Sequence, residues 1–156
     1  MQVVASAEER GRGSRLDEIA EALPSRASAI SRLFLTHSTL EISRTEANAL
    51  SALAERPRRI TELALGEGVT QPAITLLVNR LENRGWLRRD ADPADGRAVL
   101  VSLTDRGVEV LDRLRGEYRA LVHEEMATLP DEDVEALARA VEVLEGLIER
   151  LMARTP

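Results

Sequence analysis

Side chains able to hydrogen bond to nucleic-acid bases recur at helical spacing between residues 70 and 84. They project away from an apolar stripe that lies on a single helix face. The stripe consists of Ile74, Leu77, Val78 and Leu81. The opposite face carries Pro72, Thr75, Leu76, Asn79, Arg80 and Asn83. Because most of these side chains can contact base edges or phosphates, the spacing predicts a helix that packs on one side and recognises a ligand on the other.

Local signals before this helix predict a second, shorter helix and a tight turn. Thr70 occupies the N-cap position, where its hydroxyl can satisfy an early backbone N–H, and Pro72 is tolerated in the first turn. The helix N-terminus is then free to face a phosphate. Upstream, Thr61 can cap a helix through Leu65, and Gly66-Glu67-Gly68 supplies positive-φ positions for the turn. These signals are typical of a helix-turn-helix.

A β-hairpin is predicted directly after Gly85, where the apolar period changes from 3.6 to 2. Val99, Val101 and Leu103 alternate with Leu100 and Ser102, as expected for a strand with one buried face. The segment 86–89 is the expected partner strand. Asp95-Gly96 is a strong signal for the tip of the hairpin. Two helices followed by this hairpin form the layout of a winged helix.

Arg97 falls near the tip of the predicted hairpin and allows two interpretations. Its guanidinium could enter a minor groove, where narrow A·T-rich tracts concentrate negative potential. Alternatively, Arg97 is a solvated arginine paired with Asp95. The residues alone leave both interpretations open.

Three segments, in this order and spacing, resemble the multiple antibiotic resistance regulator (MarR) family of bacterial transcription factors. They are VTQPAITLLVNRLENRGWLRR, DPADGR and LTDRG, and the resemblance covers nearly the whole chain. It implies that the helix from Thr70 to Arg84 enters the major groove of DNA and that Arg97 reaches the minor groove beside Asp95. The DNA-binding residues implied in this way are Thr70, Gln71, Pro72, Thr75, Leu76, Asn79, Arg80, Asp95 and Arg97.

Leu76 departs from the family pattern, which often has a basic or polar residue at this position. A leucine there could touch the methyl group of a thymine. The other interpretation is that the protein makes one phosphate contact fewer. The sequence does not decide between them.

Composition restricts the class of protein. A chain of 156 residues with 44% apolar content is ordinary for one compact domain. There is no cysteine, which excludes disulfides and thiolate metal sites. The N-terminus is too charged for a signal peptide, and no stretch of 18 uncharged apolar residues occurs. We therefore expect a cytoplasmic protein that does not bind a membrane.

The charge distribution singles out the predicted winged helix. The formal net charge of −6 looks unsuited to a DNA-binding protein. From Arg56 to Arg97, however, eight arginines face six acidic residues, a net +2, whereas the rest of the chain has thirteen arginines and twenty-one acids, a net −8. DNA affinity should therefore come from this local patch and should fall steeply with salt.

The segments before the winged helix are predicted to be helical. Ser43-Arg44-Thr45-Glu46 is a capping box for a helix to about Glu55. Pro24 is expected to begin an earlier helix that continues to about His37, after a shorter piece over residues 16–23. Residues 1–14 are predicted to form a mobile N-terminal arm.

The C-terminal third is predicted to form two helices divided near Leu129-Pro130. In the second, apolar residues alternate spacings of three and four, as in a coiled coil. This seam consists of Val134, Leu137, Val141, Leu144, Ile148 and Leu151. Taken alone, the seam could pack within one chain or against a second copy. The resemblance favours a homodimer formed by these helices together with the N-terminal helix.

Together these observations predict a mainly α fold with a small β-wing. The expected single domain is 15–156, with dimerisation helices at 15–42 and 108–156 and a winged helix-turn-helix lobe at 43–107. The resemblance implies a homodimeric DNA-binding regulator, a repressor of an inverted-repeat operator that is released by a small anionic or phenolic effector. His37, Arg44 and Arg115 lie near the family's effector cleft, but ordinary surface positions explain them better.

Two other classes of function are alternatives to a DNA-binding regulator. An enzyme is not expected: His123-Glu124 begins like a zinc-protease motif, but Ala127 stands where the second histidine belongs. We predict no catalytic residues, no metal site and no cofactor. The remaining alternative is a winged-helix dimer that acts as a protein-interaction module without sequence-specific DNA binding.

Overall fold

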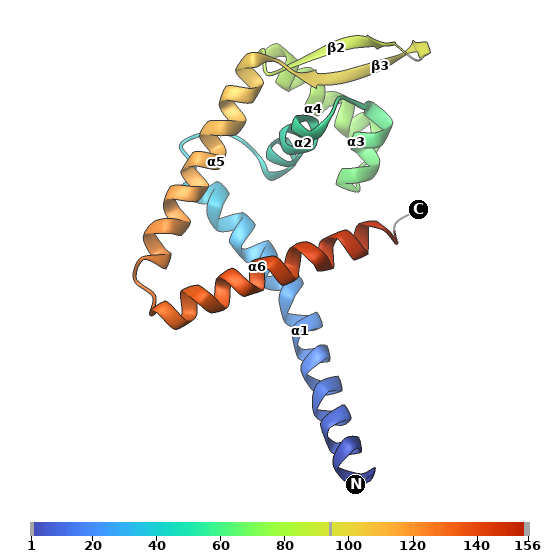
Figure 1. The fold of residues 1–156 in the computed structure, drawn as a ribbon. Coiled ribbons are helices and arrows are strands. Elements are labelled where there is room, and N and C mark those ends of the chain that lie inside the picture. Colours follow the sequence, from blue (N-terminus) through green and yellow to red (C-terminus); the bar gives the residue numbers. More distant parts are fainter. Residues whose placement is uncertain (1, 94, 155–156) are drawn as a thin grey trace. The chain divides into compact units, whose positions relative to one another are not determined.

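The computed structural model describes residues 2–93 and 95–154, with side chains for residues 11–93, 95 and 98–154. The chain divides into two compact units, Met1–Gly116 and Glu117–Pro156. The first unit holds a three-stranded antiparallel sheet in the order β1-β3-β2, and the rest of its regular structure is helical (Figure 1). The predicted fold class, mainly α with a small β-wing, is confirmed.

The first helix, α1, runs without interruption over Gln2–His37, with Pro24 inside it. The prediction that Pro24 begins a helix is therefore wrong, and residues 2–14, expected to be a mobile arm, are helical. An internal proline removes one hydrogen bond but leaves those on either side intact, so a long helix can continue through it. The apolar side chains of Leu16, Ile19, Ile30 and Leu33 on α1 are each more than half exposed.

Helix α2 (Arg44–Glu55) begins at the predicted capping box. The Ser43 hydroxyl accepts a hydrogen bond from the Glu46 N–H at 3.3 Å, and the Glu46 carboxylate accepts one from the Ser43 N–H at 2.8 Å. This reciprocal pair fixes the start of the helix. Ala49, Leu50 and Leu53 then pack into the core of the first unit.

The helix-turn-helix consists of α3 (Ile60–Glu67) and α4 (Gln71–Asn83). The N-cap of α3 is Arg59 and not Thr61, because the Glu62 carboxylate accepts the Arg59 N–H at 2.7 Å and draws the helix start upstream. Gly66 remains helical, so within the predicted turn the positive φ falls on Gly68, at 63°. The turn is therefore shorter than the sequence predicts.

The apolar stripe of α4 is buried as predicted: Ile74, Val78 and Leu81 are fully buried, and Leu77 is 5% exposed. It packs in one cluster with side chains of α2, α3, α5 and the sheet. After α4, Gly85 adopts a positive φ of 74°, which turns the chain into the next strand. The stripe thus fixes which side of α4 faces outward.

The predicted hairpin consists of β2 (Leu87–Asp92) and β3 (Asp95–Leu103), paired from Leu87↔Leu103 to Asp92↔Asp95. It extends past α3 in Figure 1. The expected alternation is only partly right, because Val101 and Ser102 are both buried whereas Val99 is 45% exposed. A third strand, β1 (Arg58–Arg59), pairs with β3 and was not predicted.

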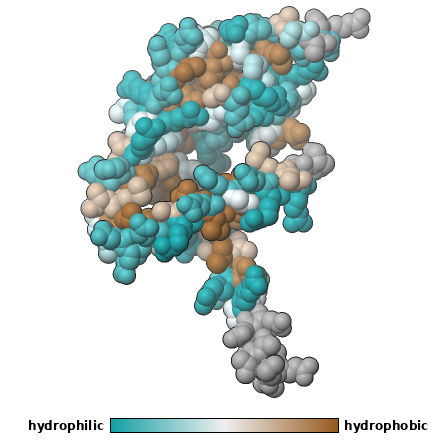
Figure 2. All heavy atoms as spheres, viewed as in Figure 1, coloured by the Kyte–Doolittle hydropathy of each residue, from teal (hydrophilic) through white to brown (hydrophobic). Residues whose placement is uncertain are grey.

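Helices α5 (Asp105–Met126) and α6 (Asp131–Met152) are separated at the predicted break. The Thr104 hydroxyl accepts the Gly107 N–H at 3.0 Å and donates to the Gly85 carbonyl at 2.6 Å, which ties the start of α5 to the end of α4. No residue of α6 is buried, and its apolar side chains reach the surface as brown spheres in Figure 2. None of the described helices is long and apolar enough to cross a bilayer.

Candidate nucleic-acid interface

The outward face of α4 presents the predicted recognition residues to solvent. Most of them are exposed, namely Gln71, Pro72, Leu76, Asn79, Arg80 and Asn83. Thr75 is half-buried, and its hydroxyl donates to the Gln71 carbonyl at 2.8 Å. The Thr75 hydroxyl can therefore act toward an outside partner mainly as an acceptor.

The N-terminus of α4 is open, as an anion-binding helix end requires. Thr70 is the N-cap residue, but its side chain makes no capping hydrogen bond, contrary to the role predicted for its hydroxyl. Pro72 lies in the first turn, where its missing N–H removes no intrahelical bond. The first N–H groups of α4 have no acceptor within the helix, so together with the Thr70 hydroxyl they can serve a phosphate.

Asn79 is held in one orientation by an arginine on the wing. The Arg89 Nη2 group donates to the Asn79 Oδ1 atom at 2.6 Å, and Arg89 also forms an ion pair with Glu82. Arg89 extends from β2, whereas Asn79 and Glu82 belong to α4. The wing strand thus fixes a side chain in the middle of the recognition face.

Arg80 keeps its charge available although an acid lies near it. Its Nε atom is 3.7 Å from the Glu46 carboxylate, which is buried and already accepts the Ser43 N–H. The side chain of Arg80 is 63% exposed. At 3.7 Å the contact is long, and Glu46 keeps its hydrogen bond with the Ser43 N–H when Arg80 turns toward a phosphate.

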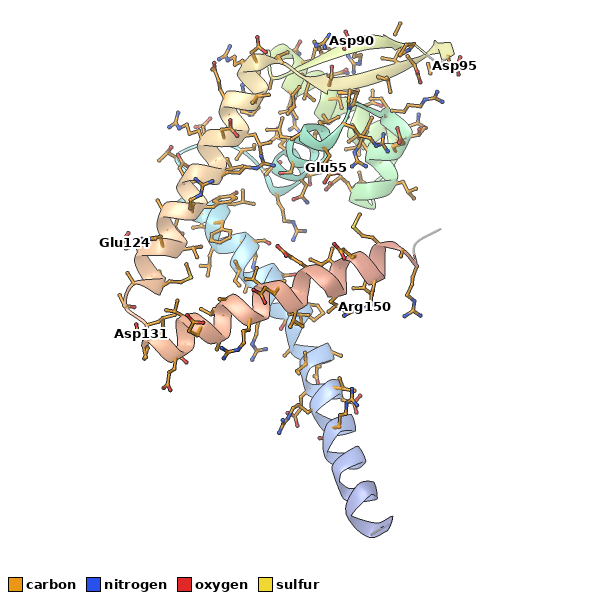
Figure 3. The ribbon with its side chains drawn as sticks, viewed as in Figure 1. Glu55, Asp90, Asp95, Glu124, Asp131 and Arg150 are labelled. Atoms are coloured by element: carbon orange, nitrogen blue, oxygen red, sulfur yellow. The ribbon has the colours of Figure 1, made fainter. Side chains whose placement is uncertain are left out.

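The tip of the wing is organised around Arg59. Its guanidinium donates to the Asp92 carboxylate at 2.6 Å and lies 3.8 Å from the Asp95 carboxylate, which Figure 3 labels at the far end of the hairpin. The hydrogen bond and the charge of Asp92 raise the pKa of Arg59 above its ordinary value. The side chain of Arg97, which one of the two interpretations pairs with Asp95, lies outside the described residues.

Most arginines of the basic segment already have acidic neighbours. Arg56 pairs with Glu62, Arg58 with Glu55, and Arg88 with Asp90. The contact with Arg56 and the Arg59 N–H lower the pKa of Glu62. The formal charge of the segment is therefore larger than the positive charge available for binding DNA. Phosphates would have to compete with the acidic partners in these exposed ion pairs.

The two residues that sequence reasoning missed are Arg59 and Arg89, which bind the wing to its neighbours: Arg59 pairs with Asp92, and Arg89 contacts Asn79. The available signal was strand alternation: in Leu87-Arg88-Arg89 consecutive side chains point to opposite faces, so one arginine had to face α4. Among the predicted residues, the structure brings Thr70, Gln71, Pro72, Leu76, Asn79 and Arg80 onto one face of α4 or its start. Asp95 lies apart from them, on the wing.

The first unit also contains shallow grooves. One of about 500 Å³ lies beside Trp86, and the guanidinium of Arg84 sits 5.0 Å from the Trp86 ring centre. The residues lining it are Thr39, Leu40, Glu41, Asn83, Arg84, Trp86 and Arg106. In the described part of the chain, no group of three His, Asp or Glu side chains is placed to hold a metal ion.

The geometry is that of a winged helix-turn-helix protein with an exposed recognition helix and a two-stranded wing. A family model described as MarR family matches residues 40–98. An HTH-type transcriptional regulator of Mycobacterium bovis, Mb0904, is 30% identical over 109 residues, which cover 69% of this chain and 76% of the relative. The transcriptional regulator HosA of Escherichia coli is 35% identical over 77 residues, which cover 48% of this chain and 56% of HosA.

Solved structures support the same assignment as the related sequences. The transcriptional regulator Tm0710 of Thermotoga maritima has a TM-score of 0.68 and 26% sequence identity to this protein. The match covers 91% of this chain and 99% of the Tm0710 chain. A mutant form of MarR from E. coli has a TM-score of 0.71 over 81% of this chain and 95% of its own, at 23% identity, and so shows the shared fold alone. The chain belongs to the MarR family of transcriptional regulators, and its helix-turn-helix is a DNA-binding one.

Proposed function

We propose that this regulator is a homodimeric repressor that binds an inverted-repeat operator through α4 and the wing. The observation that carries the proposal is the outward face of α4, which is open to solvent while its opposite face is buried. Its contacts would come from Thr70, Gln71, Pro72, Thr75, Leu76, Asn79 and Arg80, with Asp95 and Arg97 on the wing. Such a regulator would act in the cytoplasm.

Support for a homodimer comes from the seam on α6. Leu137, Val141 and Ile148 are each more than 40% exposed in the single chain, although they repeat at coiled-coil spacing. Exposed apolar faces of this kind mark protein interfaces. A two-fold axis would place two recognition helices about one helical turn apart on the duplex, which is why the target is expected to be an inverted repeat. In this proposal residues 15–42 and 108–156 form the dimer, and residues 43–107 bind DNA.

A charge placed in the seam tests the dimer. Val141→Glu should convert the protein to a monomer in analytical ultracentrifugation and should weaken operator binding. Val143→Glu is the matched control, because Val143 is 66% exposed on the same helix but lies off the seam. A Val141→Glu protein that sediments like the wild type would rule out the seam as the interface.

The DNA contacts are tested by titration of the operator with Arg97→Ala. If the guanidinium enters the minor groove, the loss should be about 1 to 3 kcal/mol of binding free energy. Arg139→Ala on α6 is the control for a lost positive charge outside the lobe. A wild-type affinity for Arg97→Ala would remove the wing arginine from the interface, and absence of any sequence-selective binding would favour a protein-interaction module.

A small anionic or phenolic effector would release the protein by binding more tightly to a form whose lobes do not fit DNA. Support for an anionic ligand in the first unit comes from the groove beside Trp86, which is lined by Arg84 and Arg106. A panel of aromatic carboxylates and phenols, added to the protein–operator complex, tests this. Failure of every compound to change operator affinity would count against an effector, and an unchanged response of Arg106→Gln would count against this groove.

A further inference from the structure

Leu76 and Asn79 form an unusual pair on the outward face of α4. They are three residues apart, so their side chains are neighbours on the helix surface. Leu76 is 67% exposed although it is apolar. Nothing in the described part of the chain packs over it closely enough to explain a leucine at this position.

The chemistry that Asn79 can offer to a ligand is set by Arg89. A guanidinium has only donors, so the atom facing the Arg89 Nη2 at 2.6 Å must be the carbonyl oxygen of Asn79. The ion pair of Arg89 with Glu82 holds the guanidinium in place. The amide therefore presents its Nδ2 donors outward, and one of the two lone pairs of its oxygen is engaged by Arg89.

An apolar group beside a donor matches one base edge in the major groove. Thymine displays the O4 acceptor next to the C5 methyl group. Guanine has acceptors but no methyl group, and cytosine offers only its N4 donor. The usual asparagine contact with adenine needs the amide oxygen as well as the nitrogen, and the hydrogen bond from Arg89 turns that oxygen toward β2.

We propose that Leu76 and Asn79 together read a thymine in each operator half-site, with Leu76 packing on the C5 methyl group and Asn79 Nδ2 donating to O4. The inference rests on the proposed function, since it requires α4 to lie in the major groove. It makes Leu76 a specificity residue and Arg89 a positioning residue that acts through Asn79.

Replacing thymine with deoxyuridine tests the methyl contact, because this removes the methyl group and keeps O4 and base pairing. After an operator has been selected from random DNA, each thymine of both half-sites is replaced in turn. At one thymine per half-site, wild-type protein should bind about fourfold more weakly per change, and about fifteenfold more weakly with both half-sites changed. The same change should not alter the operator affinity of the Leu76→Ala protein, because this variant lacks the side chain that contacts the methyl group.

Leu65→Ala is the matched control, since Leu65 is another exposed leucine, 83% exposed, on α3 and not on the recognition face. It should keep the sensitivity to deoxyuridine. Arg89→Gln should relax the preference at the thymine position, because a freed amide can also pair with adenine.

Three results would overturn the proposal while leaving the DNA-binding function intact. They are a selected operator with no invariant thymine in its half-sites, a deoxyuridine operator bound as tightly as the thymine operator, and a Leu76→Ala protein as sensitive to deoxyuridine as the wild type. Failure to select any operator would instead contradict the proposed function itself.

Discussion

Gly107 lies where the start of α5 meets the start of the wing, and it has no room for a side chain. A Cβ at this position would lie 2.1 Å from the Trp86 carbonyl oxygen and 3.2 Å from the Leu103 Cδ2 atom. The carbonyl oxygen belongs to the backbone and also accepts the Thr104 N–H at 3.0 Å, so it cannot swing away alone. Gly107→Ala must therefore push α5 away from the strand.

The expected cost follows from the size of the clash. Overpacking of a tight site costs about 1 to 3 kcal/mol, and a backbone contact this short belongs at the upper end. Alanine recovers about 0.5 to 1 kcal/mol of helix propensity over glycine. The net loss should be about 2 to 2.5 kcal/mol, which for a chain of this size lowers Tm by about 4 to 10 °C.

Thermal unfolding followed by circular dichroism, at one fixed protein concentration, measures this loss. Gly66→Ala is the control: Gly66 is also helical and in the same unit, but nothing lies within 4 Å of its Cβ position. That variant should gain up to about 1 kcal/mol of stability. A Gly107→Ala protein with a Tm equal to or above that of the wild type would refute the close packing of α5 against the wing.

Two further predictions concern charge. The pKa of Glu62 is lowered in the folded protein, so its contribution to stability is present above the ordinary value of 4.5 and is lost as the pH falls through the lowered pKa. Urea unfolding should therefore show a steeper loss below about pH 4.5 in the wild type than in Glu62→Gln, and equal profiles would contradict this. Arg80→Gln should weaken operator binding similarly for all sequences and reduce the slope of log Kd against log salt by about one, whereas Arg139→Gln on α6 should not. An unchanged slope for Arg80→Gln would show that Arg80 contacts no phosphate.

The parts of the fold that could be predicted are those with local causes. The buried stripe of α4 follows from the 3.6-residue period of Ile74, Leu77, Val78 and Leu81. The start of α2 follows from Ser43 and Glu46, which are three residues apart and satisfy each other's backbone donors. Each of these signals lies within one or two helical turns of sequence, so no knowledge of the tertiary fold was needed.

The parts that could not be predicted depend on partners far away in sequence. Strand β1 exists because Arg58 and Arg59 pair with β3, and two residues alone carry no strand signal. The contact between Arg59 and Asp92, and that between Arg89 and Asn79, join different elements, so only the folded chain reveals them. In α1 the local signal misled, since Pro24 favours a helix start but is tolerated inside a longer helix.

Selection of bound fragments from random double-stranded DNA is the most direct measurement of how this protein acts. A dimer that inserts two α4 helices should enrich an inverted repeat whose half-sites lie about one helical turn apart. Each half-site should contain an invariant thymine. If no sequence is enriched over repeated rounds at low salt, α4 and the wing do not recognise DNA in the manner proposed.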